Sequence, residues 1–293
     1  MNWQGVIPAI TTPFREDLSV DHDFLAKHAS WMIDNGCTGI VALGSLGEGA
    51  TLEFDEKIAV LQTCVRSARL PVAAAISALS TQAAVRLAKA AADAGCSGLM
   101  VLPPYVYSTD WREMKAHVTT VIRATSLSCM LYNNPIAYRT DFLPEQIAEL
   151  AEEHENLHAV KESAGDVRRI AAIRELIGQR LAIFVGVDDL IVEGISAGAV
   201  GWIAGLVNAF PRESVALFER TARGENVFEL YRWFLPLLRL DTVPKFVQLI
   251  KLVQAEVGMG TEHVRPPRLE LEGTEREAAL RVIRAAIASR PRV

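Results

Sequence analysis

Short apolar runs alternate with longer amphipathic segments along most of the chain. Eight runs are nearly continuous in apolar character, which suits parallel strands covered on both faces. They are residues 5–10, 38–43, 71–76, 97–102, 128–132, 157–161, 181–185 and 199–203. The segments between them have helical periodicity, for example residues 21–34, 53–67, 81–93 and 144–153. This alternation predicts an α/β fold.

Three of the predicted strands follow the same kind of junction, in which a glycine ends the preceding helix. These glycines are Gly36, Gly95 and Gly198. Every predicted strand is followed by a helix, and no G-x-G-x-x-G follows the first strand, so we favour a (β/α)8 TIM barrel over an open doubly wound sheet. The strand signal stops near residue 225, and helices are expected over 226–258 and 274–289. We expect a barrel over residues 1–225 and a C-terminal helical appendage over 226–293.

Composition narrows the class of protein. The chain has 293 residues, of which 50% are hydrophobic and 22% charged, enough for one large core. Its net charge is −5 and its basic residues are scattered, which argues against nucleic acid as a partner. No apolar stretch reaches the roughly 18 residues that span a bilayer, and the N-terminus lacks a basic region followed by an apolar one. We therefore expect no membrane association and a cytoplasmic location.

Cysteine and histidine spacing argues against a metal site. The four cysteines show no C-x-x-C spacing, so reduced thiols are expected rather than disulfides or zinc ligands. The six histidines form neither His-x-His nor His-Glu-x-x-His. No metal is expected.

The most informative residue is Lys161, which closes the apolar run of the sixth predicted strand. Burial lowers the pKa of an amine, and a neutral amine can attack a carbonyl to form a Schiff base. A strand-end lysine can also snorkel to the surface or form an ion pair. The other six lysines fall in predicted helices, where solvated surface roles are expected: Lys27, Lys57, Lys89, Lys115, Lys245 and Lys251.

A glycine-rich loop, residues 44–49, follows the second strand. In a barrel the C-terminal ends of different strands converge on one mouth, so this loop and Lys161 can meet. Its glycines let backbone N–H groups approach an anion and Ser45 adds a hydroxyl, which suits a substrate carboxylate. A nucleotide phosphate is a weaker alternative, since the glycine order is wrong and Glu48 repels phosphate. An ordinary turn in which Glu48 caps the next helix is an equal alternative.

Three further strand ends carry polar groups or wall residues. The fifth strand ends in Tyr132-Asn133-Asn134-Pro135, where Tyr132 can shuttle protons or simply fill space. The loop after the seventh strand, residues 186–189, and the loop after the eighth strand, residues 204–208, which follows Ile203, are expected to form wall. For Asp188 and Asp189 we favour a role at a helix N-terminus over a catalytic one.

These motifs, together with Val160-Lys161-Glu162-Ser163, resemble the dihydrodipicolinate synthase / N-acetylneuraminate lyase family over essentially the whole chain. The resemblance implies that Lys161 forms an imine with a 2-oxo acid, Tyr132 relays protons, and the loop after the second strand holds the carboxylate. It also implies homotetramers and neither metal nor organic cofactor. The substrate-binding residues it implies are Ser45, Leu46, Gly47, Tyr107, Asn134, Gly186, Asp188 and Ile203.

The chain departs from the synthases of that family at three places. Their Thr-Thr pair corresponds to Ser45-Leu46, and the second tyrosine of their Pro-Pro-Tyr-Tyr segment corresponds to Val106, which Tyr107 would have to replace. Their arginine for the second substrate aligns with Ala137, with Arg139 nearby but offset. These departures argue against synthase activity.

The Tyr-Asn-Asn-Pro motif, the loop at 186–189 and the run at 204–211 look more like the branch that contains pyrroline-4-hydroxy-2-carboxylate deaminase and 2-keto-3-deoxypentonate dehydratase. Our leading hypothesis is therefore elimination of the C4 hydroxyl from a small 2-oxo acid or its cyclic imine, giving 2-oxoglutarate semialdehyde. The alternatives are a pyruvate-dependent aldolase or dihydrodipicolinate synthase-type condensation, which use the same Lys161 and Tyr132, and a non-catalytic barrel that senses a 2-oxo acid.

Overall fold

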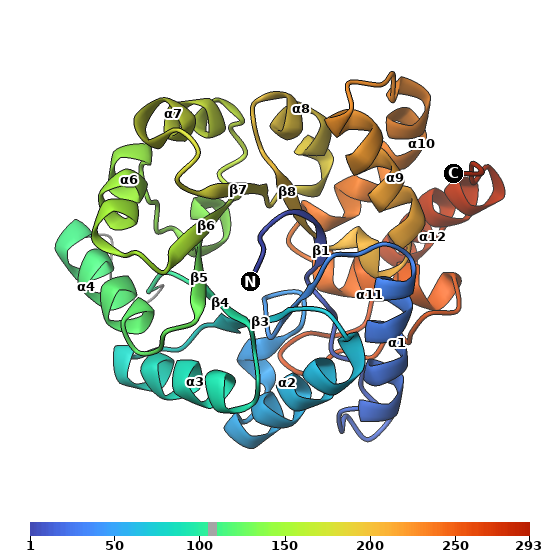
Figure 1. Ribbon diagram of the computed structural model, residues 1–293. Coiled ribbons are helices and arrows are strands. Elements are labelled where there is room, and N and C mark those ends of the chain that lie inside the picture. The colour runs from blue at the N-terminus through green and yellow to red at the C-terminus, as the bar shows by residue number, and fades with distance from the viewer. Residues whose placement is uncertain (105–109) are drawn as a thin grey trace.

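A closed barrel of parallel strands forms the centre of the computed structural model, which describes residues 1–104 and 110–293. Neighbouring strands pair in the order β1-β8-β7-β6-β5-β4-β3-β2, and a parallel bridge between Ala9 and Val41 closes the ring. The (β/α)8 architecture is thereby confirmed (Figure 1). The strands are β1 (Gly5–Pro8), β2 (Ile40–Ala42), β3 (Val72–Ile76), β4 (Gly98–Val101), β5 (Ser128–Asn133), β6 (Leu157–Glu162), β7 (Ala182–Val185) and β8 (Gly201–Ala204).

Helices surround the barrel, and the last three extend beyond the ring next to α9 (Figure 1). The α-helices are α1 (His22–Asp34), α2 (Phe54–Ala68), α3 (Thr81–Asp93), α4 (Trp111–Ile122), α5 (Pro135–Tyr138), α6 (Pro144–Glu153), α7 (Arg168–Ile177), α8 (Ile191–Ser196), α9 (Pro211–Ala222), α10 (Phe228–Leu238), α11 (Phe246–Glu256) and α12 (Gly273–Ala288). The described residues also form four short 3₁₀ helices, η1 (Gly49–Thr51), η2 (Asp188–Leu190), η3 (Leu206–Asn208) and η4 (Arg239–Asp241). Among the described residues, no helix combines the length and apolar content needed to traverse a bilayer.

The extension after α9 differs from the single helical run predicted over 226–258. It folds as two helices, α10 and α11, separated by η4 and a turn. Pro244 lies in that turn, and a proline disfavours helical geometry at the residue before it. The break places residues 239–245 in a connection that leads back toward the barrel mouth.

The N-terminus plugs the end of the barrel where the strands begin. Trp3 Nε1 donates to Ser128 Oγ at 2.7 Å, and the Trp3 ring meets Phe184 edge to face at 6.2 Å between centroids. In Figure 1 the N-terminus lies at the centre of the ring. A Cβ on Gly98 would lie 3.0 Å from both Met1 Sδ and the Trp3 ring, so glycine makes room for the plug. The opposite end, where the strands terminate, is left to hold a site.

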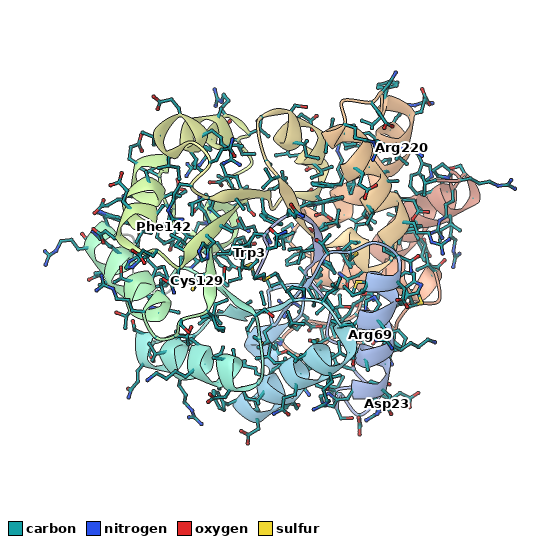
Figure 2. All side chains as sticks on the ribbon, in the orientation of Figure 1. Trp3, Asp23, Arg69, Cys129, Phe142 and Arg220 are labelled. Atoms are coloured by element: carbon teal, nitrogen blue, oxygen red, sulfur yellow. The ribbon has the colours of Figure 1, made fainter. Side chains whose placement is uncertain are left out.

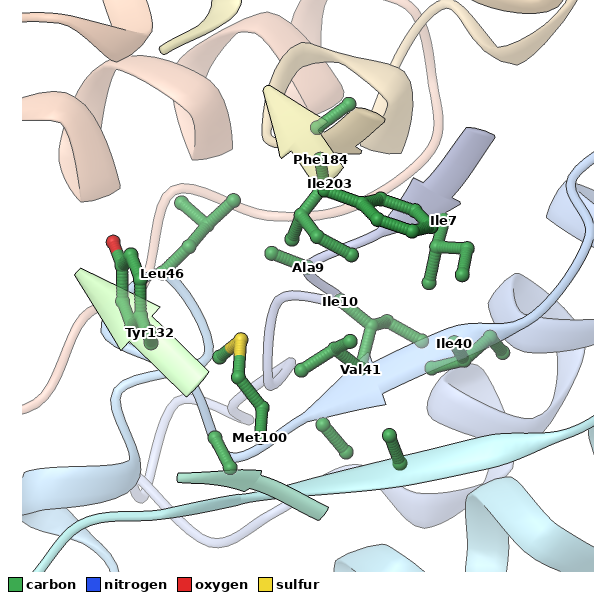
Figure 3. Close-up of a cluster of buried hydrophobic side chains, with 14 of the residues drawn as sticks. Ile7, Ala9, Ile10, Ile40, Val41, Leu46, Met100, Tyr132, Phe184 and Ile203 are labelled. Carbon is green, nitrogen blue, oxygen red and sulfur yellow. The ribbon is translucent and has the colours of Figure 1, made fainter. Parts of the chain in front are cut away.

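Side chains fill the interior of the barrel, so it is a packed core and not a pore. Figure 3 shows Ile7, Ile10, Val41 and Phe184 packed together inside the strands. Gly201 has no room for a side chain, because a Cβ there would lie 2.2 Å from the Phe184 ring.

Charged side chains lie on the outer surface of the molecule, whereas the cysteines are buried. In Figure 2, Asp23 and Arg220 project from the outer helices and Arg69 lies just after the end of α2, whereas Cys129 lies among the strands. The described chain holds four free, buried cysteines, as expected from their spacing. Burial raises the pKa of the Cys129 thiol to about 12, which keeps it protonated.

Candidate active site

Lys161 and Tyr132 face each other on adjacent strands at the open end of the barrel. They are register partners in the β5–β6 pair, and the Lys161 Nζ lies 4.1 Å from the centroid of the Tyr132 ring. Both residues are almost fully buried, since 7% of the surface of Lys161 and 5% of that of Tyr132 is exposed. The structure thus brings together the two residues that the sequence assigned to chemistry.

Lys161 has the environment that a nucleophilic amine requires. Burial lowers its pKa, while the nearby Tyr138, Asp241 and Asp188 oppose that shift. Among the described residues no carboxylate oxygen lies within 4.0 Å of its Nζ. Gly186 makes room for the side chain, because a Cβ there would lie 2.6 Å from Lys161 Cε.

Tyr132 belongs to a chain of hydroxyl groups. Its hydroxyl accepts a hydrogen bond from Asn134 Nδ2 at 3.0 Å, and its ring packs against that of Tyr138. The Tyr138 hydroxyl in turn forms a short hydrogen bond with Ser45 Oγ. Burial raises the pKa of Tyr132, and the hydrogen bonds around the phenol partly offset that rise. Ser45, Tyr138 and Tyr132 therefore lie in a row that ends beside Lys161, and this row is a candidate path for protons.

Sequence reasoning missed Tyr138. It ends the short helix α5, which Asn134 begins by accepting a hydrogen bond from the Ala137 N–H at 3.0 Å. Pro135 occupies the first turn, where its lack of an N–H costs nothing. This single helical turn carries Tyr138 back over Tyr132, and the two rings meet edge to face at 5.7 Å. The available signal was the position of Tyr138, directly after the Ala137 that replaces the synthase arginine.

The glycine-rich loop folds tightly at the mouth. A Cβ on Gly47 would lie 2.7 Å from the Ile10 carbonyl oxygen, so only glycine fits there. Thr12 Oγ1 donates to the Gly47 carbonyl at 2.6 Å and fixes the turn. Leu46 is buried, and Figure 3 places it beside Tyr132. The loop that carries Ser45 is thus held against the proton path.

Glu48 has neither of the roles considered from the sequence. Its side chain makes no capping hydrogen bond and lies fully buried. Glu48 Oε1 pairs with Lys251 Nζ at 2.6 Å, and Glu48 Oε2 accepts from the Arg265 N–H at 3.0 Å. The prediction that Lys251 is a solvated surface residue is also wrong, because α11 is buried on nearly every side and Lys251 is only 2% exposed.

Asp188 and Asp189 occupy the first turn of η2, which confirms their predicted place at a helix N-terminus, and the Asp188 carboxylate is also part of the wall. Asp188 Oδ1 accepts from Trp202 Nε1 at 2.9 Å, and Oδ2 accepts from the N–H groups of Gly205 and Leu206 at 3.1 and 2.9 Å. Burial raises its pKa to about 6, and these hydrogen bonds resist that rise. Asp188 therefore ties the β7 loop to the β8 loop.

The remaining residues predicted to bind substrate lie at the barrel mouth, in the core, or outside the described part of the chain. Asn134 and Gly186 lie beside Tyr132 and Lys161, whereas Ile203 lies in the interior cluster of Figure 3. Tyr107 falls outside the described residues. No group of three or more metal-ligating side chains occurs in residues 1–104 and 110–293.

A second missed residue is Asp241, at the end of η4 in the C-terminal extension. Its Oδ1 is enclosed and has no hydrogen-bond partner among the described residues. The carboxyl packs on Gly205, where a Cβ would lie 2.1 Å from Oδ1. Burial and the negative charge of Asp188 raise the pKa of Asp241 well above its ordinary value, and Lys161 opposes the rise. Leaving a buried polar atom unpaired costs about 1–3 kcal/mol, so this residue requires an explanation.

An enclosed strand-end lysine beside a tyrosine, in a (β/α)8 barrel, defines a lyase of the lysine Schiff-base class. The sequence profile of the Dihydrodipicolinate synthetase family matches residues 2–286. The chain belongs to that family.

Individual relatives match over nearly the whole chain. The 4-hydroxy-tetrahydrodipicolinate synthase of Bartonella bacilliformis is 30% identical over 279 residues, which cover 94% of this chain and 95% of the relative. The crystal structure of dihydrodipicolinate synthase from Aquifex aeolicus superposes with a TM-score of 0.92 at 28% identity, covering 97% and 98% of the two chains. The chloride-inhibited dihydrodipicolinate synthase from Acinetobacter baumannii, complexed with pyruvate, gives 0.89 at 28% identity and the same coverage.

Proposed function

We propose that Lys161 forms an imine with a small 2-oxo acid such as pyruvate. The observation that carries this proposal is the buried amine, free of a close carboxylate and 4.1 Å from the Tyr132 ring. A lowered pKa leaves a larger fraction of Lys161 neutral, and only the neutral amine attacks a carbonyl. The similar synthase from Acinetobacter baumannii, solved with pyruvate, supports the choice of ligand.

The hydroxyl chain supplies the proton transfers that imine chemistry needs. Tyr132 passes a proton between the reacting atoms and Tyr138, and Tyr138 exchanges it with Ser45. Tyr138 thereby takes the role that the second tyrosine of the Pro-Pro-Tyr-Tyr segment has in the synthases. In this sequence Val106 stands at the place of that tyrosine and Tyr107 follows it. The backbone N–H groups of Ser45 and Leu46 hold the carboxylate of the 2-oxo acid.

Two reactions can follow from that imine. The names of the relatives favour condensation with an aldehyde of the dihydrodipicolinate synthase type, so this is our first candidate. Elimination of a C4 hydroxyl is the second candidate. It is supported by Ala137, which is exposed where the synthases have an arginine, and by Arg139, which is exposed on a left-handed turn. The protein would act as a homotetramer in the cytoplasm, in keeping with its family.

Trapping with borohydride tests the imine. Pyruvate and borohydride should add one reduced pyruvyl group to the wild-type protein, and no mass addition would favour the 2-oxo-acid sensor over an enzyme. Parallel assays separate the possible reactions. Consumption of pyruvate in the presence of aspartate semialdehyde indicates condensation. With hydroxylated 2-oxo acids, formation of semialdehyde or ammonia indicates elimination, and release of pyruvate indicates aldol cleavage. Size-exclusion chromatography with light scattering tests the tetramer.

A further inference from the structure

The C-terminal extension is fastened to the barrel mouth at η4. Arg239 Nε lies 3.6 Å from Asp189 Oδ2, and the Tyr231 hydroxyl of α10 donates to the Asp189 carbonyl. These contacts join the extension to η2, the first turn after β7. They place Asp241, two residues after Arg239, over Gly205 at the end of β8.

Asp241 and Asp188 both lie against Gly205, since the Gly205 N–H donates to Asp188 Oδ2 at 3.1 Å and a Cβ on Gly205 would lie 2.1 Å from Asp241 Oδ1. Both carboxyl groups are close enough to Lys161 to raise its pKa against the effect of burial. Their hydrogen bonding differs. The carboxylate of Asp188 accepts from an indole and two backbone N–H groups, so it is committed to holding the wall. Asp241 Oδ1 accepts from nothing in the described chain. A carboxyl kept in this state inside a substrate mouth has its hydrogen-bonding capacity available for a ligand.

We propose that Asp241 donates a proton to an oxygen on C4 of the substrate bound to Lys161. The inference rests on the proposed imine and deepens it by naming the substrate class, 2-oxo acids that carry or acquire a C4 oxygen. An uncharged carboxylic acid can donate a hydrogen bond, as a carboxylate cannot. Burial and the neighbouring Asp188 favour that uncharged form.

The same donor serves both candidate reactions. In condensation, the electron pair of the C3 enamine forms the C3–C4 bond, the aldehyde π electrons move to its oxygen, and that oxygen takes the Asp241 proton to become the C4 hydroxyl. In elimination, C3 loses a proton to the tyrosine chain, the C4–O bond breaks with its electron pair on oxygen, and the Asp241 proton completes a water molecule. Asp241 is left as a carboxylate in each case and regains a proton from solvent between turnovers.

A pair of substitutions separates hydrogen bonding from proton donation. Asp241→Asn keeps a hydrogen-bond donor of the same shape but has no acidic proton, whereas Asp241→Ala removes both. The probes are 2-oxopentanoate and 4-hydroxy-2-oxopentanoate, which differ only in the C4 hydroxyl. Each is trapped with borohydride over a concentration series, and pyruvate, which has no C4, reports whether the imine site is intact.

The wild-type protein should trap the hydroxylated probe at concentrations at least tenfold lower than 2-oxopentanoate. Asp241→Asn should keep that preference, and Asp241→Ala should bring the two probes within twofold of each other. Trapping of pyruvate should stay within twofold of wild type in both variants. With whichever C4 substrate is turned over, Asp241→Asn should lower kcat roughly 10²-fold to 10⁴-fold.

Three results would overturn the assignment of Asp241: no preference in the wild type, a preference that survives in Asp241→Ala, or a kcat of Asp241→Asn within threefold of wild type. Loss of pyruvate trapping in Asp241→Ala, with the protein still folded by circular dichroism, would instead assign the residue to building the site. Failure of the wild type to trap any of the three probes would refute the proposed imine itself, and so is distinct from those outcomes.

Discussion

The molecule contains two buried lysines in opposite electrostatic situations. Lys251 in α11 lies over the Phe14 ring, with its Nζ 2.6 Å from Glu48 Oε1 and 2.7 Å from the His263 carbonyl. Lys161 Nζ lies 4.1 Å from the centroid of the Tyr132 ring, close to the 4.3 Å between Lys251 Nζ and the centroid of the Phe14 ring. Unlike Lys251, Lys161 has no carboxylate oxygen within 4.0 Å of its Nζ among the described residues. Burial lowers the pKa of both amines, and only for Lys251 does a directly bonded carboxylate counteract it.

The difference teaches what a buried lysine needs in order to react. A close carboxylate holds the ammonium form and uses its N–H groups, so Lys251 serves to fasten the glycine-rich loop to the C-terminal extension. Asp188 and Asp241 act on Lys161 from a greater distance and leave its nitrogen accessible to a carbonyl carbon. Burial alone therefore does not mark a nucleophile, whereas burial without a bonded anion does.

Replacing Lys161 gives the largest expected effect. Lys161→Ala should have no detectable turnover and no borohydride-dependent mass increase, because no other amine lies at the head of the tyrosine chain. The measurement is intact-protein mass spectrometry with pyruvate, beside a thermal melt that shows the variant is folded. Full activity in a folded Lys161→Ala protein would contradict the assignment.

Removing the phenol of Tyr132 should leave the imine but slow its reactions. Tyr132→Phe retains the ring that packs on Lys161 and loses the proton transfer, so we expect kcat to fall roughly 10²-fold to 10⁴-fold. Trapping of pyruvate should remain close to wild type. A variant that turns over at the wild-type rate would exclude Tyr132 from the proton path.

Lys251 should respond in stability and not in chemistry. Lys251→Met leaves Glu48 buried with only the Arg265 N–H and Arg268, 3.8 Å away, and should lower the free energy of unfolding by about 3 kcal/mol. Urea unfolding measures this loss, and the double variant Glu48→Gln/Lys251→Met should recover part of it. The folded fraction of Lys251→Met should still trap pyruvate at Lys161. A loss below about 1 kcal/mol would show that the Glu48–Lys251 pair does not hold the glycine-rich loop to the C-terminal extension.

The pH dependence of trapping should report the lowered pKa of Lys161. The neutral amine is the reactive form, so the rate of imine formation rises with pH and levels off above the pKa of Lys161. Because burial lowers that pKa, half of the maximal rate should be reached below the ordinary lysine value of 10.5. Initial rates of borohydride trapping at saturating pyruvate give the profile, with Lys251→Met as the control that should not shift it. A midpoint at or above 10.5 would contradict the account.

The smallest expected effect concerns Ser45, at the far end of the hydroxyl chain. Ser45→Ala removes one hydrogen bond to Tyr138, worth about 0.5–1.5 kcal/mol, and should lower kcat by roughly threefold to tenfold. KM should change less, since backbone N–H groups hold the carboxylate. Steady-state kinetics separate the two, and a purely KM effect would assign Ser45 to binding instead.

The fold could be predicted from the sequence because its signals are local. Eight apolar runs gave eight strands, and α3 (Thr81–Asp93) has the predicted bounds. Lys161 and Tyr132 could be found because a polar residue that ends an apolar strand contradicts its surroundings. Their meeting across the β5–β6 pair then follows from the barrel.

Residues placed by tertiary contacts could not be predicted in the same way. Tyr138 reaches the site through a single helical turn, and Asp241 reaches it through a break within a segment that reads as continuous helix. The pairing of Glu48 with Lys251 joins residues 203 positions apart. Lys251 did carry a signal, since apolar residues 249–250 and 252–253 flank it on both sides, and a charge enclosed by apolar residues must be paired.

The most direct measurement locates the pyruvyl group within the wild-type chain. After trapping with pyruvate and borohydride, peptide mapping by tandem mass spectrometry distinguishes all seven lysines. We expect a single modified peptide, with the added mass on Lys161 and none on the equally buried Lys251. An adduct on Lys251, a distribution over surface lysines, or no adduct would contradict the account.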